Sequence, residues 1–221
     1  MPTNFLSLPS ELRNDIYEQV LTGFSNNIEE SMCEDDDQES QIPGLLLANK
    51  RIYLEASSVL YAATTFDLSI YRMPEVVKFL ERIGRRNASF ILNIRIDFPY
   101  LKDLRIARVT FEDESEAALA AIRDYCTSLR TLTAVRESVS TMEETLLVHN
   151  QYRKGYEMPM MALQLADERF RAVASLQEII IELDEGIPPT YLRTEMKRRG
   201  WRIVEFEEHV PGFPSPDEDE E

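Results

Sequence analysis

The stretch Phe5-Leu6-Ser7-Leu8-Pro9-Ser10-Glu11-Leu12-Arg13-Asn14-Asp15-Ile16-Tyr17-Glu18-Gln19-Val20-Leu21 decides how the N-terminal part of the chain folds. Its apolar residues recur at about every fourth position, which places them on one face of a helix. A proline stands at the expected first helical position, where a missing N–H leaves no helical hydrogen bond unmade. The spacing therefore predicts an amphipathic helix whose apolar stripe is formed by Leu8, Leu12, Ile16, Val20 and Leu21. The polar residues of the segment, including Arg13, are expected to face elsewhere.

A second helical block follows and ends in Thr64-Thr65-Phe66. It reads Ile42-Pro43-Gly44-Leu45-Leu46-Leu47-Ala48-Asn49-Lys50-Arg51-Ile52-Tyr53-Leu54-Glu55-Ala56-Ser57-Ser58-Val59-Leu60-Tyr61. Together the two blocks resemble the F-box-like domains that are abundant in filamentous fungi. The first block matches the family pattern Leu-Pro-x-Glu-Leu-Arg-Asn-x-Ile-Tyr-Glu. In the second, Asn49, Lys50 and Arg51 stand where the family commonly has Cys, Arg and Gln.

The resemblance implies an interaction adaptor. An F-box docks its protein onto the Skp-type adaptor of a cullin–RING ubiquitin ligase, and the rest of the chain holds a protein substrate, which the sequence does not name. The residues expected to bind the adaptor are Leu8, Pro9, Leu12, Ile16 and Ile52. In a second hypothesis the helices are only the core of a scaffold, with Leu12 and Ile16 packed against Leu46, Ile52 and Val59. We expect no enzyme, because no catalytic constellation can be assembled.

The net charge of −16 is concentrated in two segments. Residues 29–39 hold seven acidic residues and residues 205–221 hold eight, and neither segment contains Lys or Arg. The remaining chain has 25 acidic and 24 basic residues and is close to neutral. Such acidic segments are typical of solvated, self-repelling chain. Nucleic-acid binding is not expected, because phosphate contacts need a basic surface.

Composition also bounds the compartment. No apolar run approaches the ~18 residues that would span a bilayer, so no membrane insertion is expected. The start lacks a basic flank followed by an apolar block, so we expect no signal peptide. With only Cys33 and Cys126, the chain has no disulfide framework, which favours the reducing cytoplasm or nucleus.

After the helical blocks, short apolar runs alternate with helical patterns. Strand patterns occur at 64–68, 90–96, 129–135, 176–183 and 201–206, and helical patterns at 73–83, 114–127, 140–152, from 159 and 188–200. This rhythm predicts a mainly parallel sheet with crossover helices. The fold class is thus α+β: F-box-like helices followed by an irregular α/β layer that resembles degenerate leucine-rich repeats. The expected domains are a helical module at 4–62 with an acidic insert at 25–41, an α/β region at 63–207, and an acidic disordered tail at 208–221.

A search for catalytic, metal or cofactor chemistry yields no candidate. The seven glycines are scattered singly, so no phosphate-binding loop is present, and His149 and His209 have no partner at metal-ligand spacing. We therefore expect neither a metal nor a cofactor. Cys126, at the end of an apolar helix face, is interpreted as a buried structural thiol. Adjacent carboxylates such as Glu143 and Glu144 are expected on solvated faces. Ser140 with Glu143 forms a capping-box pattern that predicts a helix start.

Overall fold

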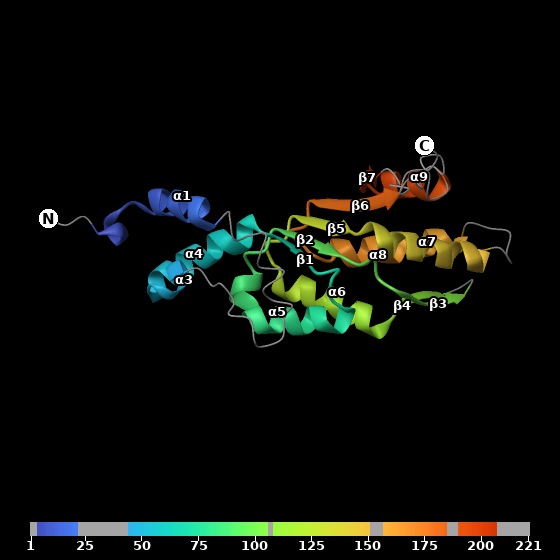
Figure 1. Cartoon of the computed structure of the whole chain (residues 1–221). Coiled ribbons are helices and arrows are strands. Elements are labelled where there is room, and N and C mark those ends of the chain that lie inside the picture. Colours follow the sequence, from blue (N-terminus) through green and yellow to red (C-terminus); the bar gives the residue numbers. More distant parts are fainter. Residues whose placement is uncertain (1–3, 22–43, 106–107, 151–156, 185–189, 207–221) are drawn as a thin grey trace, which may run out of the picture.

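The computed structural model describes residues 4–21, 44–105, 108–150, 157–184 and 190–206. The acidic insert, the acidic tail, Cys33 and His209 lie outside these residues. The described chain begins with a helical module (Figure 1). It consists of a 3₁₀ turn η1 (Phe5–Ser7) and the helices α1 (Ser10–Leu21), α3 (Gly44–Leu47) and α4 (Lys50–Ala63).

An α/β region follows the module. Its strands are β1 (Thr65–Asp67), β2 (Asn93–Ile96), β3 (Leu101–Arg105), β4 (Arg108–Phe111), β5 (Thr131–Ala134), β6 (Glu178–Asp184) and β7 (Arg202–Phe206). Its helices are α5 (Met73–Ala88), α6 (Asp113–Tyr125), α7 (Arg136–Asn150), α8 (Glu157–Arg171) and α9 (Thr190–Arg198). The predicted mixture of helices with a parallel sheet is confirmed.

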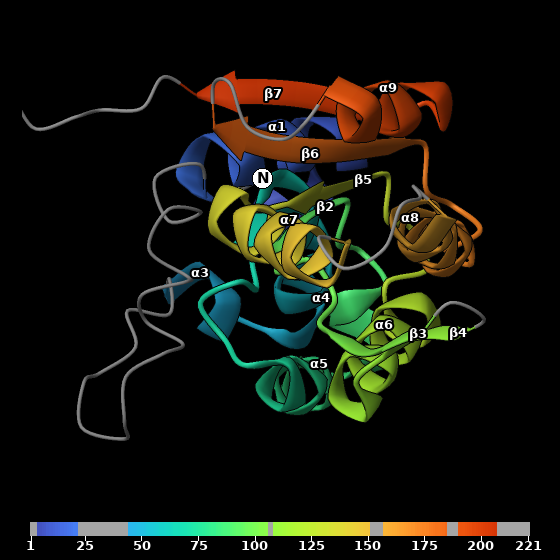
Figure 2. The same cartoon turned by 90° about the vertical axis from the view of Figure 1, so that its right-hand side faces the viewer.

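The main sheet has five strands in the order β1-β2-β5-β6-β7, and every neighbouring pair is parallel. Each strand is thus added beside the one before it, and a helix lies in every connection, as parallel pairing requires. Figure 2 shows β7, β6, β5 and β2 following one another, with α9, α8 and α6 along one side.

The two faces of the sheet differ in chemistry. Phe66, Ile94, Leu132 and Ile179 stand in register and are almost fully buried, as is the next row along the strands. The intervening residues of β1, β2 and β5 are polar (Asp67, Arg95 and Thr133), whereas β6 contributes Ile180 to this row. Arg95 Nε donates to Asp67 Oδ2 at 2.9 Å, and its Nη1 donates to Glu182 Oε1 at 2.6 Å, so one arginine joins β1, β2 and β6. Parallel sheets are normally covered by apolar layers on both faces, whereas here one face carries an ion-pair network.

Two secondary-structure elements were not predicted correctly. The hairpin β3–β4, an antiparallel pair with Leu101 opposite Phe111, was not predicted. Phe111 is buried in the main core, and Val109 packs against it. Helix α7 begins at Arg136, directly after β5, so the capping box at Ser140 was wrong. The Ser140 hydroxyl lies inside the helix and donates to the Arg136 carbonyl oxygen at 3.1 Å.

Gly84 interrupts α5 at the point where the sequence predicts the helix to end. Its φ of 79° and ψ of 158° are non-helical, and the helical turn that continues to Ala88 runs on beyond this kink. A side chain at this φ would be strained, which explains why glycine serves here.

The expectation that Glu143 is solvated was wrong. Only 1% of this residue is exposed, and neither carboxyl oxygen has a hydrogen-bond partner among the described residues. Helix α7 packs against β6, and this packing covers the carboxyl group. Burial is the largest cause that raises the pKa of Glu143; Arg193 opposes this shift and Asp184 adds to it, and the resulting pKa is about 8.

This carboxyl group makes stability depend on pH. Because the pKa of folded Glu143 lies above its unfolded value, the folded state holds the proton more tightly, and stability falls as pH rises from about 4.5 to about 8. Glu143→Gln is therefore expected to raise the free energy of unfolding at pH 9 by on the order of 2 kcal/mol, at about 1.4 kcal/mol per pKa unit less the burial of a new amide. Urea titrations at pH 4 and pH 9 measure the change.

The matched control is Glu144→Gln, which alters an exposed neighbour on the same helix. This variant should follow the wild type at both pH values. A gain for Glu143→Gln that is equal at pH 4 and pH 9 would contradict the assignment to an ionised buried carboxylate.

Candidate functional site

Helix α1 presents two neighbouring stripes with different environments. Arg13, Tyr17 and Leu21 are buried, with at most 3% of their surface exposed. Leu12, Ile16 and Val20 each precede one of them and are 49%, 36% and 45% exposed. Since one residue turns a helix by about 100°, the exposed stripe lies beside the buried one. We call Leu12, Ile16 and Val20 the α1 stripe.

The buried side of α1 packs against α4 in a small core separate from the main one. Its buried members are Tyr17, Leu21, Ile52, Ala56 and Leu60. The ring of Phe5 meets Tyr17 edge-on, with centroids 5.6 Å apart. The change from this cluster to the main core falls at the end of α4, where the ring of Tyr61 stacks on Phe66 at 5.4 Å. The domain boundary expected between residues 62 and 63 stays a prediction.

An ion pair fixes how α1 lies on α4. Arg13 Nε and Nη2 each donate to a carboxylate oxygen of Glu55 at 2.7 Å, which is a bidentate arrangement. The hydroxyl of Tyr17 donates to Glu55 Oε2 at 3.0 Å, and Arg51 Nε donates to Oε1 at 3.0 Å. Arg13 Nη1 also donates to the carbonyl oxygen of Leu8, which joins the turn before α1 to the same cluster. The hydrogen bonds from Arg13 hold the pKa of Glu55 at about 2.

Sequence periodicity did not separate the two stripes. It placed Arg13 outside and expected the apolar residues to share one environment, yet Leu21 alone of the five is buried. The signal that was missed has two parts. Arg13 and Tyr17 are four residues apart, so they share one face of the first helix, and Glu55 on the second helix can accept hydrogen bonds from both. Asn49 caps the N-terminus of α4: its Oδ1 accepts hydrogen bonds from the backbone N–H groups of Arg51 and Ile52 at 2.9 and 3.0 Å.

The expected adaptor-binding residues fall into two groups. Leu12, Ile16 and Pro9 are exposed, and Leu8 is half-buried. Ile52 lies in the small core with 8% of its surface exposed, so the candidate surface does not include it. The packing required by the scaffold hypothesis, with Leu12 and Ile16 inside this core, is not formed.

Cys126 and the basic residues near the end of α9 are in structural environments. Cys126 is fully buried, and burial raises the pKa of its thiol to about 12, so the reactive thiolate is not populated near neutral pH. Arg198 and Arg199, in the basic cluster at the end of α9, both pair with Glu195 at 2.7 Å. Among the described residues, no group of three or more His, Cys, Asp and Glu side chains could hold a metal ion.

The fold and this surface define a mixed α/β protein with an N-terminal helical module that exposes an apolar stripe. Comparisons with protein-family models, with curated proteins and with solved structures find no match to this chain. None of the described helices has the length and apolar character needed to cross a membrane.

The ion pair predicts how firmly α1 is held. Glu55→Gln is expected to speed amide hydrogen exchange in α1 at pH 7, because the pair contributes stability above the unfolded carboxyl pKa of 4.5. This contribution is lost as pH falls through the folded value of about 2, so the two proteins should converge there.

The control is Arg51→Gln, which removes the more exposed partner of the same carboxylate. It should change exchange in α1 less than Glu55→Gln does. Equal exchange in the wild type and Glu55→Gln at pH 7 would show that the ion pair does not hold α1.

Proposed function

We propose that this chain is an F-box-like adaptor that docks a Skp-type protein of a cullin–RING ubiquitin ligase through the α1 stripe. The observation that carries the proposal is the exposure of Leu12, Ile16 and Val20 along one line of α1. Single exposed apolar residues are ordinary on protein surfaces. Three in line, four residues apart, form the kind of strip by which an amphipathic helix binds a groove of a partner.

The position of the stripe supports this role physically. Helix α1 lies at the far end of the molecule from α7 and α9 (Figure 1), and its attachment to α4 uses the neighbouring stripe. A partner can therefore cover Leu12, Ile16 and Val20 without displacing the small core. Pro9 is exposed just before the helix and extends the same surface in sequence. The α/β region would then present a protein substrate, and the chain would act in the cytoplasm or nucleus.

The scaffold hypothesis retains one supporting observation. Ile52 is a core residue, and Tyr17, Leu21, Ala56 and Leu60 complete its cluster, so part of the F-box-like sequence serves the fold. This hypothesis offers no use for the α1 stripe. The two readings are therefore separated by what happens when the stripe alone is truncated.

The test is a pull-down of the purified protein with a Skp-type adaptor, wild type beside Leu12→Ala/Ile16→Ala. Truncation of an interface anchor costs about 2 kcal/mol or more, which weakens binding about 30-fold for one residue. Binding by the double variant should therefore be lost. Its circular dichroism and its urea midpoint should stay close to the wild type, because both side chains are exposed.

The matched control is Glu11→Ala/Asn14→Ala, which truncates two exposed residues elsewhere on α1. This variant should bind the adaptor as the wild type does. A well-folded wild type that does not bind would overturn the proposal, and so would a double stripe variant that binds with unchanged affinity.

A further inference from the structure

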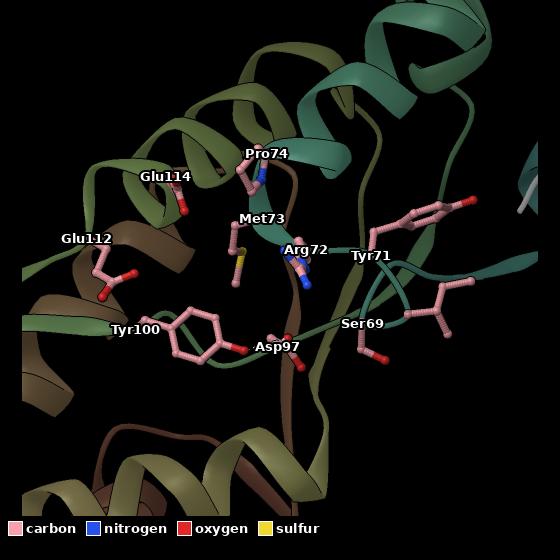
Figure 3. A pocket seen from close by; sticks show the side chains of 10 residues that line it. Ser69, Tyr71, Arg72, Met73, Pro74, Asp97, Tyr100, Glu112 and Glu114 are labelled. Atoms are coloured by element: carbon pink, nitrogen blue, oxygen red, sulfur yellow. Dashed lines mark hydrogen bonds between the residues drawn. The ribbon is translucent and has the colours of Figure 1, made fainter.

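A pocket lies on the α/β region, away from the α1 stripe. Its volume is about 440 Å³. It is lined by the residues that follow β1 and β2 and by those at the starts of α5 and α6, so four separate points of the fold meet there (Figure 3). The loops at the carboxyl ends of parallel strands are a common position for ligand sites in α/β proteins.

The charged side chains of the lining are mostly acidic. Asp97, Glu112 and Glu114 line the pocket together with Arg72, so three carboxylates and one guanidinium group share it. Within the described part of the chain, none of the three carboxylates forms an ion pair. The only hydrogen bond to the Asp97 carboxylate from a described residue comes from the hydroxyl of Tyr100, at 3.0 Å from Oδ2.

Asp97 is the least solvated of these carboxylates. It is half-buried, and burial raises the pKa of its carboxyl group. The nearby carboxylates of Asp67 and Glu137 raise this pKa further, whereas the hydrogen bond from Tyr100 lowers it. A cation beside Asp97 would relieve this repulsion, because an opposite charge favours the ionised carboxylate.

The other walls of the pocket are apolar or aromatic, so the aliphatic stem or the planar group of a long side chain can pack on them. Tyr100 is 41% exposed, and its ring stands beside Asp97 with Met73 across from it (Figure 3). Ile70 is 56% exposed at the rim. A long cationic side chain lays its stem on apolar surface and its charge near carboxylates or over an aromatic face.

We propose that this pocket binds an arginine or lysine side chain of a protein partner, held by Asp97, Glu112 and Glu114 and packed on Tyr100. The pocket has room for one such side chain with its neighbouring backbone, being within the range of about 300–1,000 Å³ seen for ligand pockets. The negative charge of the pocket favours a cationic partner, because the three carboxylates would repel an anionic segment.

This inference deepens the proposed function but is tested apart from it. If the chain presents a substrate to a ligase, the pocket is where a basic segment of that substrate binds. The experiment below needs no adaptor. A failure of adaptor docking and a failure of peptide binding are therefore separate results.

The experiment titrates the ¹⁵N-labelled full chain with capped pentapeptides that differ only at the central residue of Gly-Gly-x-Gly-Gly. The central residue is arginine, lysine, citrulline (a neutral relative of arginine) or glutamate. We expect saturable amide shifts at Ser69–Met73, Asp97 and Tyr100 with arginine and lysine, at a dissociation constant of about 1 mM. Added salt should weaken the binding, because the charges are partly exposed.

Variants assign the binding to the pocket. Asp97→Asn and Glu112→Gln should each weaken binding by about two- to fivefold, as loss of a partly exposed ion pair does. Arg72→Ala should strengthen it, because a repelling cation is removed. The control Glu81→Gln removes an exposed carboxylate of α5 outside the pocket and should leave the affinity unchanged.

The outcomes that overturn the proposal are equally specific. Equal shifts with the citrulline peptide would show that charge is not recognised. Binding of the glutamate peptide that is lost in Arg72→Ala would show that the pocket takes anions. Absence of localised shifts with the arginine and lysine peptides would show that it binds neither.

Discussion

The burial of one apolar row across four of the five parallel strands is the constraint on which the rest of the structure depends. Phe66, Ile94, Leu132 and Ile179 form one buried row across the sheet. A slip of one residue in β1, β2 or β5 would exchange a member of this row for one of the polar row formed by Asp67, Arg95 and Thr133, so the register of these strands is strongly fixed. The polar row then brings Arg95 between Asp67 and Glu182, and the carboxyl ends of β1 and β2 bring together the lining of the pocket.

The helical module depends on the same sheet through its last helix. Tyr61 of α4 stacks on Phe66 of β1, and α4 in turn carries Glu55, which holds Arg13 and Tyr17 of α1. Because a bidentate ion pair, Tyr17 and Leu21 attach α1, the other aliphatic residues of the helix are not needed for attachment. This division leaves the α1 stripe available to a partner, and it explains why a helix of low apolar content can be both fixed and exposed.

Several elements could be predicted from local patterns because their residues specify them locally. The apolar run at 176–183 predicted a strand, which is present as β6. The helical pattern at 188–200, which ends at a glycine, predicted a helix, which is present as α9. Other features depend on contacts that are remote in sequence. Glu143 is buried because α7 packs on β6, and the hairpin β3–β4 is recognisable only from the packing of Val109 and Phe111.

The sequence by itself determined the class of fold and the presence of an amphipathic first helix, because strand and helix periodicities are properties of neighbouring residues. It also provided the list of apolar residues from which a docking surface could be built. Only the tertiary structure decided which of them face outward. That choice depends on the pairing of Arg13 with Glu55, 42 positions away, and a long-range ion pair leaves no periodic signature in the chain. The convergence of Asp97, Tyr100 and Glu112 on one pocket is equally a result of how the strands and helices are arranged.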